Sequence, residues 1–400
     1  MSRLFAPSAM CKRSLLALIW LGVAAGTPAA AQESGQAGQD EPGVIVFGQS
    51  AALGGPAREL GEGMRLGLEA AFNEINAAGG VHGNRLELVS LDDGYEPEAA
   101  IINTRRLIED QDVFALIGPV GTPTSQVAVP IATDAGVPYI GAFTGAEFLR
   151  DAQALPNVIN IRASYFQETE EMAARLSEDL NLNSVSIFYQ DDSYGRAGLA
   201  GLRRAADRYG MDIAIEVSYP RNTEAVRMAL LDLRRAQAEA VVIIGAYQPV
   251  STLIRWARKI DYSPHFINIS FIGSEALARI LGEDGEGVYV TQVVPFPEDA
   301  SLPVVAEYQA AMRRMDSSAE PSFVSLEGYL AGRLAAAGLE LVGPEPTRDD
   351  FLRALKISGD IDLSGFQLTY GIDDNQGSDQ VYLTVIDQNG DFASVDRIGN

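Results

Sequence analysis

The chain has 400 residues, of which 47% are hydrophobic and 21% charged, a balance typical of a globular protein with large cores. Its 30 basic and 54 acidic residues give a formal net charge of −24, which excludes general nucleic-acid binding because that requires a basic face. Two histidines and one cysteine are too few for the usual zinc sites, for Cys–His nucleophilic catalysis or for a disulfide framework.

The N-terminal segment is predicted to be an export signal over residues 1–31. Three basic residues and no acid precede a short apolar run at residues 14–25, and Ala29–Ala31 matches a small-residue cleavage motif. The run is too short to span about 30 Å of hydrocarbon, and the charge layout disfavours the alternative, a buried N-terminal helix. We therefore expect cleavage after Ala31, a flexible leader at residues 32–42 and a periplasmic mature protein. Loss of the three cations changes its net charge from −24 to −27.

Strands and helices are predicted to alternate along the rest of the chain. Short apolar or β-branched runs that end in turn residues predict the strands Val44–Phe47, Leu86–Leu91, Val113–Ile117, Pro138–Ile140, Val185–Tyr189, Ile213–Val217, Ala240–Ile244, Phe266–Ile269 and Val288–Thr291. Helical spacing and helix start signals predict helices at Glu59–Ala77, Pro97–Ile108, from the turn Gly118–Thr124 to Ala135, Gly195–Tyr209, Thr223–Ala236, Pro249–Ile260, Val304–Met315, Val324–Leu339 and Arg348–Leu355. The tail is expected to hold two further strands, Phe366–Tyr370 and Val381–Ile386, with Asp387–Gly390 (DQNG) as a hairpin turn.

This alternation indicates an α/β protein in which helices cover both faces of parallel sheets. About ten strands exceed what one sheet comfortably holds, so two α/β lobes are favoured over one. The glycine-rich run Gly61–Gly67 (GEGMRLG) is not interpreted as a nucleotide-binding fingerprint, because it falls inside a predicted helix and lacks a strand immediately before it.

Small and polar segments follow the predicted strands, where ligands bind in open parallel sheets. These segments are Gly48–Gly55, Asp92–Tyr95, Gly118–Thr124, Tyr189–Tyr194, Gly245–Pro249 and Ser270–Glu275. Hydroxyls, tyrosines and the N–H groups of helix starts suit a small polar or carboxylate ligand. Thr122 and Thr124 lie where a helix is expected to begin, so their hydroxyls either cap that helix or bind a ligand. Capping is favoured for these two residues taken alone.

Three stretches carry a resemblance to a known family. They are Glu74–Gly83 followed by Asp92-Asp93 (EINAAGGVHG…LDD), Gly118–Ser125 followed by Val137–Ala146 (GPVGTPTS…VPYIGAFTGA), and Phe188–Gly195 (FYQDDSYG). They resemble the type I periplasmic substrate-binding proteins of ABC importers, in the branch that binds Leu, Ile and Val, and the resemblance extends over residues 43–400. It implies two Rossmann-like lobes joined by a three-stranded hinge, with the ligand in the cleft between them. Lobe 1 would comprise residues 43–162 and 295–373, and lobe 2 residues 163–294 and 374–400.

The resemblance also implies ligand-binding positions. The hydroxyl that receives a ligand carboxylate falls on Thr122, and paired backbone and hydroxyl positions fall on Ala142 and Thr144. Tyrosines of the second lobe fall on Tyr194 and Tyr247. With neighbouring residues of the strand-end and hinge segments, the predicted ligand-binding set is Tyr95, Thr122, Thr124, Ala142, Phe143, Thr144, Ser164, Tyr165, Gln167, Glu168, Asp192, Tyr194, Tyr247 and Ser270.

One position departs from the family pattern. The acidic partner of a ligand ammonium falls on Ser270, and Glu275, five residues further along, cannot be assumed to replace it. Either Glu168 or Asp192 supplies the missing charge, or the ligand lacks an ammonium, as an organic acid, an amide or an aromatic or aliphatic carboxylate does. The alternative for Asp192 is a charge at a helix N-terminus, and the alternative for Tyr95 is a place on the surface.

The implied function is the solute-binding component of an ABC importer, which captures an amino-acid-like or carboxylate ligand by hinge closure and delivers it to a permease in the inner membrane. A ligand-sensing module of a receptor system is the main alternative. An exported hydrolase is disfavoured, because the sequence has no G-x-S-x-G motif and its two histidines are too few for a Ser–His pair. We expect a monomer with no enzymatic activity, no cofactor, no metal and no nucleic-acid partner.

Overall fold

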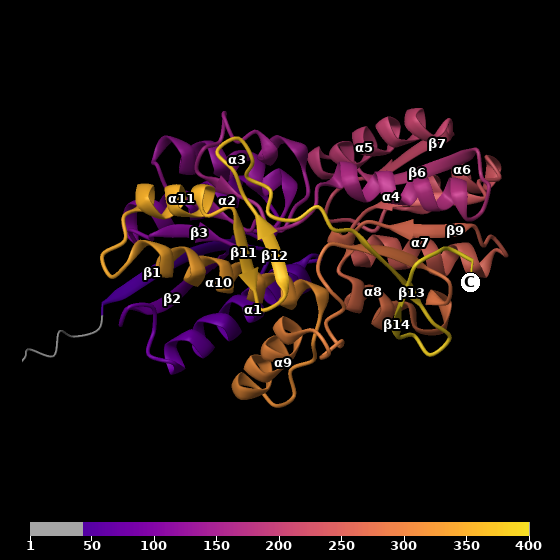
Figure 1. Ribbon diagram of the computed structural model, residues 1–400. Helices are drawn as coiled ribbons and strands as arrows, with labels where there is room; N and C mark the ends of the chain where they lie inside the picture. The colour runs from indigo at the N-terminus through magenta and orange to yellow at the C-terminus, as the bar shows by residue number, and fades with distance from the viewer. Residues whose placement is uncertain (1–42, 400) are drawn as a thin grey trace, which may run out of the picture. The chain divides into compact units, whose positions relative to one another are not determined.

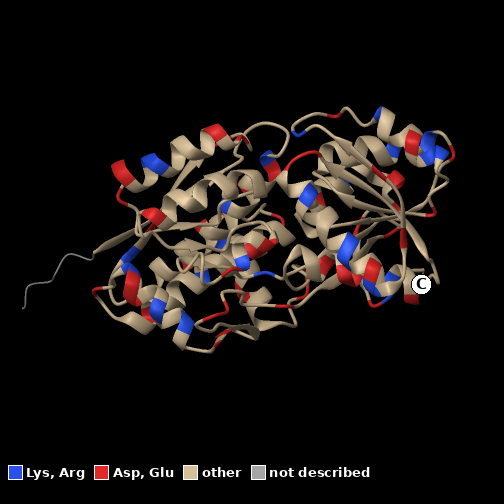
Figure 2. Ribbon diagram, turned by 90° about the horizontal axis from the view of Figure 1, so that it is seen from above, with Lys and Arg blue, Asp and Glu red and all other residues tan. Residues whose placement is uncertain are grey.

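The computed structural model describes residues 43–399, so the predicted signal peptide and leader lie outside the described residues. Within that range, no helix combines the length and the apolar character that crossing a membrane requires. Acidic residues are spread over many helices and loops along the ribbon and are interspersed with basic ones (Figure 2).

The first sheet contains five parallel strands in the order β2-β1-β3-β4-β5 (Figure 1). Its strands are β1 (Val44–Ala51), β2 (Arg85–Asp92), β3 (Ala115–Ile117), β4 (Tyr139–Ile140) and β5 (Val158–Ile159). The helical segments between them are α1 (Arg58–Ala77), α2 (Pro97–Arg105), the π-helical η1 (Arg106–Asp110), α3 (Thr122–Asp134) and the 3-10 helix η2 (Glu147–Arg150). Three helices from later in the chain share its hydrophobic core: α9 (Pro303–Met315), α10 (Phe323–Val342) and α11 (Arg348–Ile357).

The second sheet contains seven strands in the order β14-β13-β10-β9-β8-β6-β7. Five are parallel, namely β6 (Ser184–Gln190), β7 (Asp212–Tyr219), β8 (Ala240–Ile244), β9 (His265–Asn268) and β10 (Tyr289–Gln292), and two are antiparallel, β13 (Tyr382–Ile386) and β14 (Phe392–Val395). Its helices are α4 (Tyr165–Glu178), α5 (Ser193–Tyr209), α6 (Arg227–Arg235), α7 (Tyr247–Lys259) and α8 (Ser274–Leu281), with short 3-10 turns η3 (Ser270–Ile272) and η4 (Gly282–Gly285).

Two connecting segments lie side by side between the sheets. Asn160 follows β5, and its N–H donates to Asn375 O at 2.8 Å, while the N–H of Gly377 donates to Asn160 O at 2.9 Å. The segment near residue 375 follows a two-stranded antiparallel ribbon of β11 (Asp360–Leu363) and β12 (Phe366–Thr369) and leads to β13. The chain thus passes from the neighbourhood of one sheet to the other at two adjacent places.

Glycines bring α1 and α10 into close contact. A Cβ on Gly67 would lie 1.9 Å from Ser325 O, and a Cβ on Gly328 would lie 2.3 Å from Met64 O. Any side chain there would force the helices apart. The run Gly61–Gly67 lies inside α1 as predicted, and its last glycine packs against α10.

The predicted alternation and its division into two sheets are confirmed, and so is the DQNG turn, where Gly390 has a φ of 85°. The second sheet departs from the parallel arrangement at one edge, where β13 and β14 are antiparallel. Helix α6 begins at Arg227 instead of Thr223, because Thr223 Oγ1 donates to Pro220 O and holds a turn there. Helix α4 was not anticipated, although Ser164 and Gln167 form a capping box at its start that the sequence S-x-x-Q displays.

Candidate ligand-binding site

The predicted ligand-binding residues come from the carboxyl ends of strands in both sheets. Thr122 begins α3 after β3, and Thr144 follows β4; from the second sheet, Tyr194 lies in the first turn of α5 after β6, and Ser270 follows β9. A backbone hydrogen bond joins the segments that carry Thr122 and Thr144, because Phe143 N donates to Pro119 O at 2.8 Å. These four residues therefore lie just beyond the carboxyl ends of the strands, where ligands bind in open parallel sheets.

A hydroxyl cluster consists of Thr122, Thr144 and Tyr165. The Oγ1 atoms of Thr122 and Thr144 are 2.6 Å apart, and Thr144 Oγ1 donates to Tyr165 OH at 3.3 Å. All three side chains are buried. Because each hydroxyl can both donate and accept, the cluster contains the hydrogen-bond donors that a ligand carboxylate requires.

Neither threonine at the start of α3 caps that helix, so the capping interpretation was wrong. The N-cap is Gly121, with a φ of 105° and no side-chain hydrogen bond to the helix. Thr122 Oγ1 is used in the hydroxyl cluster, and Thr124 Oγ1 donates to Val120 O at 2.5 Å. A Cβ on Gly121 would lie 2.2 Å from the Tyr95 ring, so glycine is needed here for packing as well as for its positive φ.

Aromatic rings from both halves of the chain meet at Phe271. Its ring centroid is 4.5 Å from that of Tyr194, 5.2 Å from that of Phe143 and 6.0 Å from that of Tyr95. The rings of Tyr165 and Tyr194 are 5.6 Å apart. Tyr95 is therefore buried among these rings, and its surface alternative was wrong. Sequence reasoning missed Phe271, although it adjoins Ser270 in a strand-end segment that was singled out for its polar residues.

A charged cluster consists of Arg162, Glu168 and Glu327, none more than 2% exposed. Arg162 Nη2 lies 3.3 Å from Glu168 Oε1, and Arg162 Nη1 lies 3.5 Å from Glu327 Oε2. Arg162 also donates to Ser270 Oγ. Burial raises the pKa of Glu327 to about 7, with the Arg162 charge offsetting part of the shift. Arg162 is a second residue that sequence reasoning missed, because a lone arginine in a connecting segment shows no local motif.

Glu168 reaches the position where the family's acidic residue was expected. It accepts from Ser270 N at 2.9 Å, Ser270 Oγ at 2.9 Å and Thr291 Oγ1 at 2.6 Å, in addition to Arg162. Asp192, the other acid considered, is the N-cap of α5 and accepts from Tyr194 N at 3.0 Å and from Gln190 Nε2 at 2.7 Å. Both carboxylates are thus occupied by partners within the chain.

Three further predicted residues have structural partners. Ser164 is the N-cap of α4, and Gln167 Nε2 donates to Asp379 Oδ1 at 2.7 Å. Tyr247 begins α7, and its hydroxyl accepts from Glu59 N at 3.4 Å. Ala142 is buried in the turn after β4. The contact of these four residues with a ligand remains a prediction.

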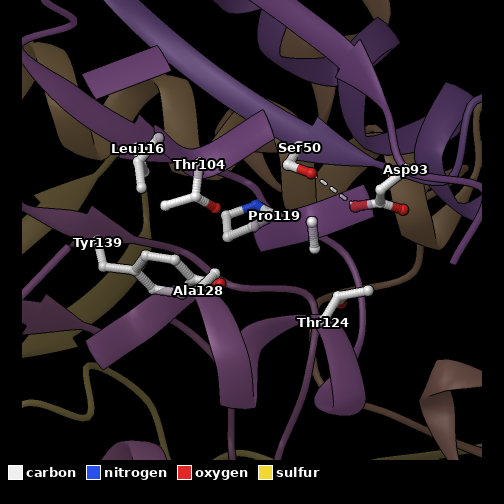
Figure 3. A pocket seen from close by; sticks show the side chains of 9 residues that line it. Ser50, Asp93, Thr104, Leu116, Pro119, Thr124, Ala128 and Tyr139 are labelled. Atoms are coloured by element: carbon white, nitrogen blue, oxygen red, sulfur yellow. Dashed lines mark hydrogen bonds between the residues drawn. The ribbon is translucent and has the colours of Figure 1, made fainter. Parts of the chain in front are cut away.

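A small cavity lies beside Thr124 in the first-sheet half (Figure 3). Its volume is about 10 Å³, enough for one water molecule and too small for an amino acid. Ser50 Oγ donates to Asp93 Oδ2 at 2.7 Å on its wall, and burial raises the pKa of Asp93 to about 6. Among residues 43–399, no group of three or more His, Cys, Asp or Glu side chains could hold a metal ion.

Two helix-covered sheets of mainly parallel strands, with hydroxyl, aromatic and charged side chains at their carboxyl ends, are the architecture of type I periplasmic binding proteins. Residues 44–391 match the family model described as periplasmic binding protein, and the chain belongs to that family. Members of the family bind solutes and are exported to the periplasm.

Individual relatives agree with this assignment. The Leu/Ile/Val-binding protein homolog 7 of Brucella abortus (strain 2308) is 29% identical over 312 residues, which are 74% of this chain and 77% of the relative. The crystal structure of a possible leucine/isoleucine/valine-binding protein from Rhodopirellula baltica SH 1 has a TM-score of 0.84 and 40% identity over 89% of this chain and 97% of that chain. LivJ from Streptococcus pneumoniae, a branched-chain amino acid transporter substrate binding protein solved with isoleucine, has a TM-score of 0.78 at 20% identity over 88% and 99%, which shows a common fold alone. The family predicted from three sequence stretches is confirmed.

Proposed function

We propose that this protein is the periplasmic solute-binding component of an ABC importer, which captures a small carboxylate or amino-acid-like ligand and delivers it to an inner-membrane permease. The observation that carries the proposal is the buried hydroxyl cluster of Thr122, Thr144 and Tyr165 beside the rings of Tyr194 and Phe271. Hydroxyls can donate to a carboxylate, and the rings offer an apolar enclosure for the remainder of the ligand.

The proposed lobes are residues 43–162 with 295–373, and residues 163–294 with 374–400. Arg150 supports a hinge between them, because it joins two connecting segments. Its Nη2 donates to Arg162 O at 3.2 Å, its Nε donates to Gln376 Oε1 at 3.0 Å, and its Nη1 donates to Thr144 O at 3.3 Å. A change in the angle between the lobes would therefore be transmitted to the turn that carries Thr144.

Contacts between the proposed lobes support a closed arrangement. Arg221 Nη2 lies 2.5 Å from Glu96 Oε2, and Asn222 Nδ2 donates to Glu96 Oε1 at 2.7 Å. Gln190 Nε2 donates to Tyr95 OH at 3.3 Å. A ligand that contacts both lobes would favour this state over an open one, because only the closed state satisfies both sets of contacts.

The first experiment is a thermal-shift screen of the mature protein against amino acids, organic acids and aromatic acids, followed by calorimetry on each hit. A ligand at one hundred times its dissociation constant is expected to add about 2.7 kcal/mol to stability. Replacing both hydroxyls with Thr122→Val and Thr144→Val should weaken binding of the hit at least about tenfold, or about 1.4 kcal/mol. Thr369→Val, at an exposed position of β12, is the matched control and should leave the affinity unchanged.

Two outcomes would contradict the proposal: no carboxylate among the library binds, or the double variant binds as tightly as the parent. Delivery to a permease is tested by uptake of the labelled hit in cells with and without the gene. Binding without any effect on uptake would instead favour the sensing alternative.

A further inference from the structure

Arg162 lies between β5 and α4, and its side chain is fully buried. Its guanidinium carbon is 5.0 Å from the centroid of the Phe143 ring and 6.0 Å from that of the Tyr165 ring. Phe143 precedes Thr144 in the chain, and Tyr165 OH accepts from Thr144 Oγ1. The guanidinium therefore lies near the ring of Tyr165, whose hydroxyl belongs to the hydroxyl cluster.

Part of this guanidinium forms no hydrogen bond with the described residues, although Nη1 lies 3.5 Å from its ionic partner, Glu327 Oε2. Within residues 43–399, neither Nε nor Nη1 of Arg162 has a hydrogen-bond acceptor, whereas Nη2 is paired with Glu168 and Ser270. Buried donors are normally paired, because an unpaired one has lost its water without compensation. In the described part of the chain, Nε has no partner and Nη1 has only the long ionic contact with Glu327, so these two donors of a buried cation could bind a hydrogen-bond acceptor from outside the chain.

The acids beside Arg162 do not offer the same opportunity to a ligand cation. Glu168 already accepts from four donors, two from Ser270 and one each from Thr291 and Arg162. Glu327 Oε1 lacks a donor among the described residues, but burial raises its pKa to about 7, so the carboxyl is partly neutral near physiological pH. The Arg162 guanidinium already lies beside the carboxyl groups of Glu168 and Glu327. An uncharged ligand oxygen could accept a hydrogen bond from the guanidinium without placing a third negative charge next to it.

We propose that Nε and Nη1 of Arg162 bind an oxygen on the carbon next to the ligand's carboxylate, so that the protein selects 2-oxo or 2-hydroxy acids over α-amino acids. This inference rests on the proposed function, because it takes the hydroxyl cluster as the carboxylate anchor. The oxygen accepts from the guanidinium, whereas an ammonium at that carbon would be repelled by the cation.

The test compares ligands that share a carbon skeleton and differ at one position. Calorimetry at pH 7.5 would measure 4-methyl-2-oxopentanoate, 2-hydroxy-4-methylpentanoate, leucine and unsubstituted 4-methylpentanoate, with phenylpyruvate, phenyllactate, phenylalanine and 3-phenylpropanoate as an aromatic series. In the series that binds, the oxo or hydroxy acid is expected to bind at least about tenfold more tightly than the amino acid. Equal or tighter binding of the amino acid overturns the inference and leaves the proposed function standing. Failure of every carboxylate, in these series and in the wider screen, overturns the proposed function as well.

Arg162→Lys keeps the charge but removes Nε and the planar pair of donors. It should lower the affinity for the oxo acid to that for the unsubstituted acid, while the unsubstituted acid changes less than about threefold. Arg333→Lys, on α10 and paired with Glu307, is the matched control and should change neither affinity. If Arg162→Lys does not fold, as judged by circular dichroism, the ligand series on the parent protein decides the question. An unchanged preference in folded Arg162→Lys overturns the inference.

Discussion

The hydroxyl cluster and the charged cluster lie next to each other but differ in how their groups are paired. Thr122, Thr144 and Tyr165 hydrogen-bond to one another, and such neutral bonds can be exchanged for bonds to a ligand at small cost. Arg162 and Glu168 are ionic partners in a fully buried setting, where removing one leaves the other unpaired. Changes in the hydroxyl cluster should therefore alter affinity, and changes in the charged cluster should alter folding stability first.

The largest effect is expected from Arg162→Met. It leaves Glu168 and Glu327 buried without a cation, which should lower the free energy of unfolding by about 3–5 kcal/mol. Urea denaturation followed by circular dichroism at pH 7.5 measures this change. Adding Glu168→Gln removes one of the orphaned charges and should recover part of the loss. A loss below about 1 kcal/mol in the single variant would show that the cluster is not ionic in the folded protein.

Local patterns allowed some of these residues to be predicted, whereas long-range contacts hid others. The alternation of strands and helices follows from hydrophobic periodicity, and the role of Asp192 at a helix start follows from the residues that come directly after it. Thr122 and Thr144 were singled out as ligand positions through a family resemblance, and the hydrogen bond between them is visible only in the structure. Arg162 could not be found in either way, because its partners Ser270 and Glu327 are more than 100 residues away and share no motif with it.

Glu168, one of the two acids considered as partners of a ligand ammonium, also shows how local and long-range information differ. From sequence, Glu168 was one of two acids considered in place of the missing one, and in the structure it accepts from Ser270 N. Its four donors and its ionic partner, however, are visible only in three dimensions, because Thr291 and Arg162 come from different segments. The sequence can therefore single out a residue without revealing which hydrogen bonds and ion pairs that residue forms.

A second, smaller effect concerns pH. Burial raises the pKa of Glu327 from an ordinary 4.5 to about 7, so the folded protein holds this proton more tightly than the unfolded chain does. The stabilisation from this carboxyl is fully present below about pH 4.5 and is lost as the pH rises to about 7, by on the order of 3 kcal/mol. Glu327→Gln should remove this dependence. Urea denaturation would measure the free energy of unfolding of the parent protein and of Glu327→Gln at several values between pH 5 and pH 8. If the free energy of unfolding changes with pH in the same way in both proteins, the prediction is contradicted.

The smallest effect is expected from Tyr165→Phe, which removes one oxygen from the hydroxyl cluster and keeps the ring beside Arg162. The free energy of unfolding should fall by about 0.5–1.5 kcal/mol, the usual net value of one buried hydrogen bond. Affinity for the carboxylate hit should fall about three- to tenfold, because the anchor loses one of its three hydroxyls. Tyr308→Phe is the matched control: its buried hydroxyl bonds to Ser325 at 2.6 Å on α10, so its loss should lower stability similarly and leave affinity unchanged. Equal affinity losses in the two variants would mean that the effect is transmitted through stability, and the hydroxyl cluster would then have no special role in binding.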